Sequence, residues 1–520
     1  MKRAQSAVEQ MIRQRVADHP DHTWLKWKKE RYSWGQVLSN IQRAANGLAE
    51  LGVRPGDRVA LMMANRPEFL WSHFAVGFLG AHSVPINISQ RGPALEHILA
   101  DAEVTAVVVQ DDLRGHVTQL RPRLPSLRHT VVVGGAAGAG IDWDFDRVMG
   151  GADREPDVEV AEPSGGVGMM YTSGTTGPPK GVVADQYDTT PILRLLEASG
   201  VRPGETMYTP LPLFHGNALF VSVTGSIILD AEFALGERFS ASRFWQECRD
   251  YEAVEFNTLG GMISILLKQP PGPADREHQV RVVLSAGCPP DRWGEFEARF
   301  GVRVIEWFGM VDSPGILLND VGKVGSMGRP VADIEFALVD DAERQLGPGQ
   351  VGELVFRHPL GRLTYYNKLP EATEEAYRGG WFHSGDLAER DEEGFYYYRG
   401  RKKESMRRLG ENISAWEIET VVNQHPAVLE SAAHAVTSEL GEDEVKLCVV
   451  ALPGQQPTPA EILDFCQGKV ARYAVPRYVE IVDELPKTGT QRVQYSELKR
   501  RGVTAQTWDR EAAGYEVQRS

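Results

Sequence analysis

Apolar side chains in the first part of the chain recur with helical and strand-like spacing in turn. Ala7–Val16 and Trp34–Leu51 carry them at intervals of three and four residues, which predicts two amphipathic helices. Gly52 is a suitable stop for the second helix. The next predicted elements are a buried strand that begins at Arg58, a helix at Phe69–Leu79 and a strand at Ser83–Ile88.

This alternation continues through Val108 and Val131–Val133 and predicts α/β layers with a largely parallel sheet. The segment Gly134–Gly166 is rich in Gly, Ala, Asp and Glu, and we expect it to be a surface connection. Tyr251–Leu267 predicts a strand followed by a helix. A chain of 520 residues is too long for one hydrophobic core, so two or more domains are expected.

Composition narrows the class of protein. The net charge of 56 − 71 = −15 argues against a general nucleic-acid or membrane binder, and no apolar run approaches the length of a membrane span. The start of the chain lacks the apolar core of a signal peptide. Four widely spaced cysteines without a CxxC motif indicate reduced thiols in a cytoplasmic protein.

The segment Tyr171–Val183, YTSGTTGPPKGVV, follows a short apolar run typical of a strand end. Its glycines allow close approach of the backbone to an anion, its hydroxyls add donors, and Lys180 adds a charge suited to phosphate. It is not a Walker A loop, because Pro178 and Pro179 precede the lysine and Gly181 follows it. A flexible linker is the alternative, but a linker has no reason to carry two prolines and a lysine here.

This loop resembles the signature of the adenylate-forming superfamily, which includes acyl- and aryl-CoA ligases, luciferases and peptide-synthetase adenylation domains. Further segments resemble its other motifs in the same order: PLPLFH at Pro210–His215, GWFHSGD at Gly380–Asp386 and GRKKESMRRLGENIS at Gly400–Ser414. Gln269–Phe300 and the ending TWDREAAGY resemble the carnitine/crotonobetaine-CoA ligase branch. The resemblance covers nearly the whole chain.

The resemblance implies a large N-terminal domain of layered α/β subdomains at residues 1–400. It also implies a small, mobile α+β lid domain at residues 401–520, with a hinge near Glu404. ATP and Mg²⁺ are the implied cofactors, coenzyme A is the implied acceptor, and the partner is a small-molecule substrate. The oligomeric state stays open.

The resemblance also implies site residues, with Asp386 and Arg401 on the ribose and Tyr398 on the adenine. The full expected nucleotide set is Thr172, Ser173, Gly174, Thr175, Thr176, Gly177, Lys180, Gly287, Cys288, Pro289, Glu306, Trp307, Phe308, Gly309, Asp386, Tyr398 and Arg401. The expected substrate pocket, suited to a small or flat molecule, is His215, with Asn217 as its polar neighbour, Gly260, Gly261, Ser285, Gly287, Gly309 and Val311. Cys288 is expected to be a packing residue, because nothing basic adjoins it.

The chain departs from the family pattern at the reacting phosphate. Val311 replaces a threonine and cannot hydrogen-bond, and Asp312 replaces a glutamate but keeps the hard oxygen that Mg²⁺ prefers. Asp312 and Thr176 are therefore the expected metal ligands. Arg492 replaces the lysine that bridges the carboxylate and the α-phosphate, and this change is not conservative. The expected catalytic residues are Arg492, His215 and Thr176.

Three functions follow from these patterns. The first is attack of a carboxylate on the α-phosphorus of ATP, giving an AMP mixed anhydride and pyrophosphate, with transfer to coenzyme A. The second is a diazotase that activates nitrite with ATP, releases AMP and diazotises an aryl amine; the three departures favour it. The third is a non-catalytic nucleotide-binding homologue, which the intact phosphate loop and ribose motif disfavour.

Overall fold

The protein's structure, a computed structural model, describes residues 5–138, 141–160, 169–172, 179–184, 188–313, 315–402, 405–408, 411–437, 443–467, 469–470, 474–488 and 492–517. Contacts between Cα atoms divide it into two units, each described here by itself. The first unit is the described chain up to Glu335 together with Arg357–Gly380. The second is Phe336–Phe356 and the described chain from Trp381 onward.

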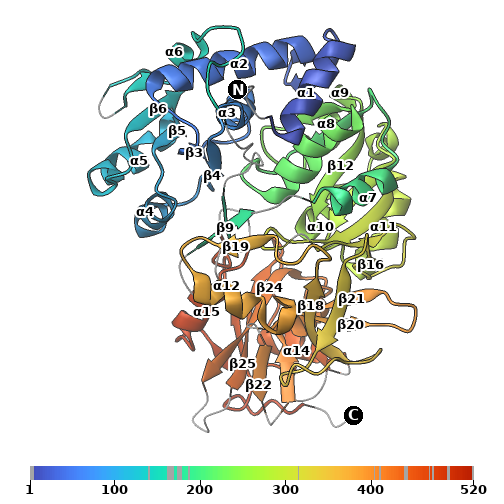
Figure 1. Ribbon diagram of the computed structural model, residues 1–520. Helices are drawn as coiled ribbons and strands as arrows, with labels where there is room; N and C mark the ends of the chain where they lie inside the picture. Colours follow the sequence, from blue (N-terminus) through green and yellow to red (C-terminus); the bar gives the residue numbers. More distant parts are fainter. Residues whose placement is uncertain are drawn as a thin grey trace. The chain divides into compact units, whose positions relative to one another are not determined.

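A parallel five-stranded sheet forms the first layer of unit one. Its spatial order is β4 (His82–Pro85), β3 (Arg58–Met62), β5 (Ala106–Gln110), β6 (His129–Val133) and β7 (Trp143–Asp144). The helices around it are α1 (Ala7–Asp18), α2 (Trp34–Leu51), α3 (Pro67–Phe78), α4 (Gly92–Asp101), α5 (Arg114–Leu120) and α6 (Phe145–Met149). Helices α2 and α3 lie on one face of the sheet, and α4 and α5 lie on the other (Figure 1). Their apolar side chains form two separate clusters with the strands.

A nine-stranded sheet forms the second layer. Its order is β16 (Arg329–Pro330), β15 (Leu317–Asn319), β14 (Arg303–Phe308), β13 (Val282–Ala286), β12 (Ala253–Leu259), β10 (Thr206–Thr209), β11 (Glu232–Leu235), β1 (Thr23–Trp27) and β2 (Glu30–Ser33). The strands from β14 to β1 in this order are parallel neighbours, whereas β16, β15 and β2 run antiparallel at the edges.

Helices cover both faces of this sheet. Residues of α9 (Phe244–Asp250), α10 (Gly260–Leu267) and α11 (Pro290–Phe300) pack with Phe256, Val283 and Val304 on one face. On the other face, residues of α7 (Thr190–Ser199) and of the π-helix η3 (Asn217–Thr224) pack with Val282, Leu284 and Ile305. The short helix α8 (Gly225–Leu229) follows η3 directly.

A three-stranded sheet of order β19 (Thr364–Tyr366), β9 (Lys180–Ala184) and β8 (Met170–Thr172) completes unit one, with α12 (Pro370–Ala376) after β19. Both strand pairs are antiparallel. Short 3₁₀ turns lie at Asp111–Leu113, Arg121–Arg123, Pro273–Arg276 and Arg378–Gly380.

Unit two holds two four-stranded sheets and one hairpin. The first sheet is β17 (Glu335–Val339), β18 (Val351–Arg357), β20 (Phe382–Arg390) and β21 (Tyr396–Arg401). The second is β24 (Val428–Thr437), β25 (Asp443–Ala451), β26 (Tyr478–Ile481) and β27 (Trp508–Asp509). The hairpin is β22 (Ser405–Arg408) with β23 (Glu411–Ser414), and the helices are α13 (Ala415–Val422), α14 (Pro459–Cys466) and α15 (Tyr495–Arg501).

The structure confirms the predicted α/β class and the three helices and two strands predicted in the first hundred residues, including the stop at Gly52, whose φ is 118°. It adds β1, β2 and α4, which were not predicted. The expectation of a mere surface connection at Gly134–Gly166 is wrong, because β7 and α6 lie within it. Phe145 and Val148 of α6 are buried in the first core. The predicted boundary at residues 400 and 401 stays a prediction, and Glu404 lies outside the described residues.

Candidate active site

The predicted phosphate loop joins two strands of the three-stranded sheet. Thr172, the last residue of β8, is the register partner of Lys180, the first residue of β9. Ser173, Gly174, Thr175, Thr176 and Gly177 lie outside the described residues. Gly181 has a packing reason to be glycine, since a Cβ there would lie 2.5 Å from the Met169 sulfur and 3.0 Å from the Tyr171 ring.

Tyr366 brings the predicted phosphate lysine and the predicted metal ligand together. The Lys180 Nζ lies 4.5 Å from the centroid of the Tyr366 ring, and the Tyr366 hydroxyl donates to Asp312 Oδ1 at 2.9 Å. Thr364 Oγ1 donates to the Asp312 carbonyl oxygen. Burial, reinforced by the Asp312 charge, raises the pKa of Tyr366, which keeps its hydroxyl a donor. No local sequence pattern pointed to Tyr366, because its place beside Lys180 depends on the pairing of β19 with β9.

Asp312 fits the Mg²⁺ that the superfamily implies. Mg²⁺ is commonly held through one or two carboxylates together with substrate phosphates and water. Within the described ranges no group of three or more His, Cys, Asp or Glu side chains gathers as a metal site. Tyr366 fixes one oxygen of the Asp312 carboxylate and holds Lys180 on its ring. One carboxylate beside one lysine suits a Mg²⁺ ion whose remaining ligands come from a bound polyphosphate and water. Thr176, the other expected ligand, lies outside the described residues.

The segment His215–Asn217 meets Val311 at a glycine. A Cβ on Gly216 would lie 2.9 Å from Val311 Cγ2, so the glycine lets this valine pack against the backbone between His215 and Asn217. Asn217 then begins the π-helix η3. Such helices are rare in proteins, and those that occur often lie at functional sites. The predicted pocket residues His215, Asn217 and Val311 are therefore brought together.

Asn217 has a partner that sequence reasoning missed. Asn257 on β12 donates from Nδ2 to Asn217 Oδ1 at 2.6 Å, whereas the sequence led us to expect Asn217 as the neighbour of His215. Asn257 is fully buried, and its register partner on β13 is Leu284. The sequence could hint at this residue only as a polar side chain inside an apolar strand.

The ends of β13 and β14 are tied by Glu306. This buried carboxylate accepts the backbone N–H groups of Gly287 and Cys288, the latter at 3.0 Å. Burial raises the pKa of Glu306 to about 7, although these donors and Ser285 oppose the rise. Gly287 has a φ of 95°, which favours glycine. Glu306 thus shapes the turn that was expected to line the nucleotide.

Other predicted residues of unit one fall around this turn. Burial raises the pKa of the Cys288 thiol, which fits a packing residue. Pro289 caps α11, Ser285 is fully buried, and a Cβ on Gly309 would lie 3.0 Å from the Trp307 ring. Phe308 ends β14, and Gly260 and Gly261 begin α10. A Cβ on Gly261 would have no neighbour within 4 Å, so this glycine is not demanded by packing.

In unit two, Asp386 and Arg401 form a pair across the ladder of β20 and β21. They are register partners, and Arg401 Nε lies 2.8 Å from Asp386 Oδ1. Asp386 lies inside β20 and is only 1% exposed. Tyr398, on β21, meets the Trp416 ring edge-on at 6.1 Å between centroids. The two predicted ribose residues are therefore brought together.

Glu353 supports this pair from β18. Its Oε1 accepts the Gly385 N–H at 3.2 Å, and its Oε2 lies 3.0 Å from Lys402 Nζ and 3.3 Å from His383 Nδ1. Burial alone would raise the pKa of Glu353, but the bonds from His383 and Lys402 lower it to about 2. The ionised Glu353 thus contacts both Gly385, the residue before Asp386, and Lys402, the residue after Arg401.

Arg492 and Lys487 differ in their surroundings. Arg492 is exposed, and its backbone N–H donates to Thr488 Oγ1 at 3.2 Å. Lys487 forms an ion pair with Glu430 at 2.6 Å. The side chain of Lys487 is therefore engaged by an acid, whereas Arg492 lies at the surface of unit two.

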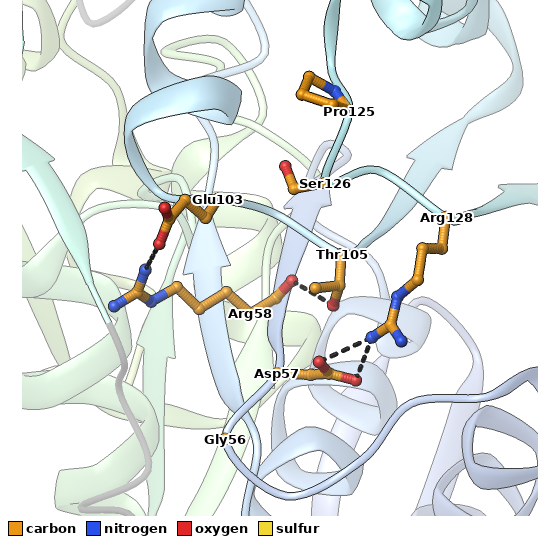
Figure 2. A pocket seen from close by; sticks show the side chains of 8 residues that line it. All are labelled: Gly56, Asp57, Arg58, Glu103, Thr105, Pro125, Ser126 and Arg128. Carbon is orange, nitrogen blue, oxygen red and sulfur yellow. Dashed lines mark hydrogen bonds and ion pairs between the residues drawn. The ribbon is translucent and has the colours of Figure 1, made fainter.

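A hollow of about 510 Å³ lies at the amino ends of β3, β5 and β6 (Figure 2). Its two arginines are each matched by an acid: Arg128 lies 2.8 Å from Asp57, and Arg58 lies 3.3 Å from Glu103. Ligands of open parallel sheets bind at the carboxyl ends of the strands. We therefore interpret this hollow as structural.

Comparison with known proteins decides the family. The profile described as AMP-binding enzyme matches residues 12–366, and the profile of the AMP-binding enzyme C-terminal domain matches residues 417–492. The chain belongs to the AMP-binding enzyme family. It is an adenylate-forming superfamily member, with a large N-terminal α/β part and a small C-terminal domain.

Several AMP-binding enzymes are similar over almost their whole length. A crotonobetaine/carnitine–CoA ligase from Salmonella typhimurium strain LT2 is 29% identical over 488 residues, which cover 90% of this chain and 93% of the relative. The anthranilate CoA ligase AuaEII, solved with anthranoyl-AMP, has a TM-score of 0.85 at 26% identity, covering 96% and 98% of the two chains. An o-succinylbenzoate CoA synthetase from Bacillus subtilis, solved with ATP and magnesium, shares the fold at a TM-score of 0.79 and 24% identity, covering 94% and 99%.

Of the helices in the described ranges, none has both the length and the apolar character needed to cross a bilayer. All four cysteines are free thiols, as predicted, and the structure shows that all four are buried.

Proposed function

We propose that this AMP-binding enzyme activates a small carboxylic acid with ATP and transfers the acyl group to coenzyme A. The observation that carries the proposal is the similarity, over nine-tenths of the chain, to a crotonobetaine/carnitine–CoA ligase. The anthranilate CoA ligase, solved with an acyl-AMP, supports the same reaction class.

In the first step a carboxylate oxygen attacks the α-phosphorus of ATP. A new O–P bond forms, the bond from the α-phosphorus to the bridging oxygen breaks, and pyrophosphate leaves with that electron pair. The protein has little covalent chemistry to perform, so positioning and charge neutralisation carry the rate. In the second step the sulfur of coenzyme A attacks the acyl carbon and AMP leaves.

The described residues take the following roles in this proposal. Lys180 neutralises phosphate oxygens beside Tyr366. Asp386 accepts the two ribose hydroxyls, because a carboxylate has two acceptor oxygens, and Arg401 holds it in place. Arg492 donates to the carboxylate and the α-phosphate oxygens with its planar fork. Asp312 would hold Mg²⁺, which supplies further neutralisation of the phosphate charge.

The second step needs a different set of residues around the acyl group. We propose that residues 401–520 act as a lid that turns about a hinge near Glu404 between the two steps, as closing elements do in many enzymes. The matched C-terminal domain, residues 417–492, falls inside this lid.

A second candidate is favoured by the three departures at Val311, Asp312 and Arg492. Nitrite, a small anion, would attack the α-phosphorus instead of a carboxylate, and pyrophosphate would leave. An aryl amine would then attack the nitrogen, AMP would leave, and loss of water would give the diazonium group. Fold alone does not separate the two reactions.

The test is a mass-spectrometric screen with ATP and Mg²⁺. Candidate acids, and nitrite with aryl amines, are each supplied with and without coenzyme A, and AMP and product are read together. A CoA thioester formed together with AMP supports acid activation. AMP release that needs nitrite and an amine but not coenzyme A supports the second candidate. ADP as the sole nucleotide product overturns both, and ATP binding without turnover identifies a non-catalytic homologue.

A further inference from the structure

Two asparagines are paired inside unit one, between the π-helix η3 and strand β12. Asn257 donates from Nδ2 to Asn217 Oδ1 at 2.6 Å. This single bond uses one hydrogen-bonding group of each amide. The remaining groups are Asn217 Nδ2, a donor, and Asn257 Oδ1, an acceptor.

Neither remaining group has a hydrogen-bond partner among the described residues, and both atoms are buried. Buried polar atoms are satisfied in the great majority of cases, and leaving one unmet costs free energy. Other buried asparagines of this chain follow the rule. Asn319 donates to the carbonyl oxygens of Lys323 and Ser326 at 2.7 and 2.9 Å and accepts from the Lys323 N–H. The Asn217–Asn257 pair is therefore set apart by one buried donor and one buried acceptor that no described residue satisfies.

The pair lies where ligands of parallel sheets bind. Asn257 is near the carboxyl end of β12, and its neighbour Leu284 belongs to an apolar cluster with Val221 of η3 and with Trp307. Trp307 Nε1 is a further buried donor without a partner in the described residues. Asn217 directly follows Gly216, against which Val311 packs. The two amides thus lie next to an apolar cluster at the predicted acid pocket.

The charge around the pair is low. Glu255 lies two residues before Asn257 on the same strand, is fully buried, and has no partner for either carboxyl oxygen among the described residues. Burial raises the pKa of Glu255 well above its ordinary value and so favours its neutral form. An ionised ligand group would find no opposite charge on this strand, whereas a neutral polar group would find both a donor and an acceptor.

We propose that Asn217 and Asn257 are specificity-determining residues that bind an uncharged hydrogen-bonding group of the substrate, such as a hydroxyl, an aromatic amine or an amide. This inference rests on the proposed function, because it assigns one class of acid to that same site. The substrate is then an acid with a neutral polar substituent besides its carboxylate. An acid with only hydrocarbon beside the carboxylate would leave both amides unmet and bind more weakly.

The test uses the full-length protein and rigid acids, so that the carboxylate and the second group keep a fixed separation. Benzoate, phenylacetate and cinnamate are compared with their meta and para derivatives carrying methyl, hydroxyl, amino or carboxamide groups. Binding is measured by calorimetry with and without ATP, and activation is measured by ATP–pyrophosphate exchange. We expect a preference of about tenfold or more for a polar substituent over methyl in kcat/KM and in Kd.

The variant Asn257→Leu should bring this ratio close to one, and Asn257→Thr, a milder change at a strand position, should lower it. Asn319→Thr is the matched control: it removes a fully bonded buried asparagine of β15, so it should reduce the melting temperature and leave the ratio unchanged. A purely structural role for Asn257 would change stability and rate for all acids alike.

The outcomes separate the two proposals. Activation of acids without a polar preference, or a preference kept in both Asn257 variants, overturns the inference and leaves the proposed function standing. Selective binding without any pyrophosphate exchange overturns the proposed function and supports the inference. Failure of every acid to bind overturns the inference as well.

Discussion

Arg401 Nε lies 2.8 Å from Asp386 Oδ1, and the two residues are register partners in the ladder of β20 and β21. The pairing fixes both side chains through the backbone of one sheet. A carboxylate that is 1% exposed and paired with an arginine is held in one orientation. This pair is therefore a sound place to test for a nucleotide.

Replacing Asp386 with asparagine should weaken ATP binding by about tenfold to hundredfold, since charge-assisted hydrogen bonds contribute about 1.5–3 kcal/mol. Calorimetric titration with ATP measures the change. Glu389→Gln is the matched control, because it breaks the neighbouring Glu389–Arg399 pair of the same hairpin, at 3.0 Å. If the Asp386→Asn and Glu389→Gln variants bind ATP equally well, Asp386 is not part of the nucleotide site.

Glu353→Gln should change how stability depends on acid. The pKa of Glu353 is about 2 in the folded protein, below its ordinary value of 4.5, so its contribution is present above pH 4.5 and is lost as pH falls toward 2. The melting temperature of the wild type should fall more steeply than that of the variant between pH 5 and 2. Parallel curves for the two proteins would show that His383 and Lys402 do not hold the charge of Glu353.

Glu306→Gln should reveal the opposite pH dependence: the Glu306 carboxyl makes the wild type less stable as pH rises. The folded pKa of Glu306 is about 7 and its ordinary value is 4.5, so the wild type loses stability as pH rises from 4.5 to 7. The loss amounts to about 3 kcal/mol, at 1.36 kcal/mol for each pKa unit. The free energy of unfolding of the variant, measured with urea, should therefore rise relative to that of the wild type between pH 5 and pH 8. A constant difference across this range contradicts the assignment.

Arg492→Ala should lower pyrophosphate exchange by about a hundredfold or more while ATP binding changes little, because the donor acts on charge that develops in the transition state. Arg492→Lys should retain part of the rate. Lys487→Met is the control, since Lys487 is occupied by Glu430 and its loss should affect stability alone. A rise of carboxylate adenylation in Arg492→Lys would instead favour nitrite as the native anion.

Tyr366→Phe removes the hydroxyl that donates to Asp312 and keeps the ring beside Lys180. If Asp312 holds Mg²⁺, the Mg²⁺ concentration for half-maximal pyrophosphate exchange should rise several-fold, because the orienting partner of a metal ligand is lost. Tyr365→Phe, on the same strand, should leave this concentration unchanged. An unaltered Mg²⁺ dependence in Tyr366→Phe would contradict the role of Asp312.

Local signals in the sequence were sufficient for many of the helices and strands. The helix from Trp34 to Leu51 ends at Gly52 because its φ of 118° suits glycine, and such stops are readable without a structure. Asp386 and Arg401 were readable from their motifs, although their contact depends on register. The α6 helix was missed because the surrounding glycines and acids dominated the average over a long segment.

The rest depends on partners that are far apart in the chain. Asn257 meets Asn217 across 40 residues, and Tyr366 meets Asp312 across 54. Both contacts depend on how elements distant in the chain pack together, and no local pattern of apolar and polar residues encodes that packing. Glu306 as the tie of the Gly287–Cys288 turn was hidden for the same reason, since it looks like an ordinary acid at the end of a strand.

The strand pairing of Thr172 with Lys180 has a practical consequence for engineering. Both ends of the predicted phosphate loop are anchored by one antiparallel ladder, so a replacement segment would enter and leave the sheet at fixed positions. A loop from another member of the family, spliced at these two positions, would enter the same backbone frame. The chemistry of the loop is thereby open to exchange while the sheet that carries it stays as it is.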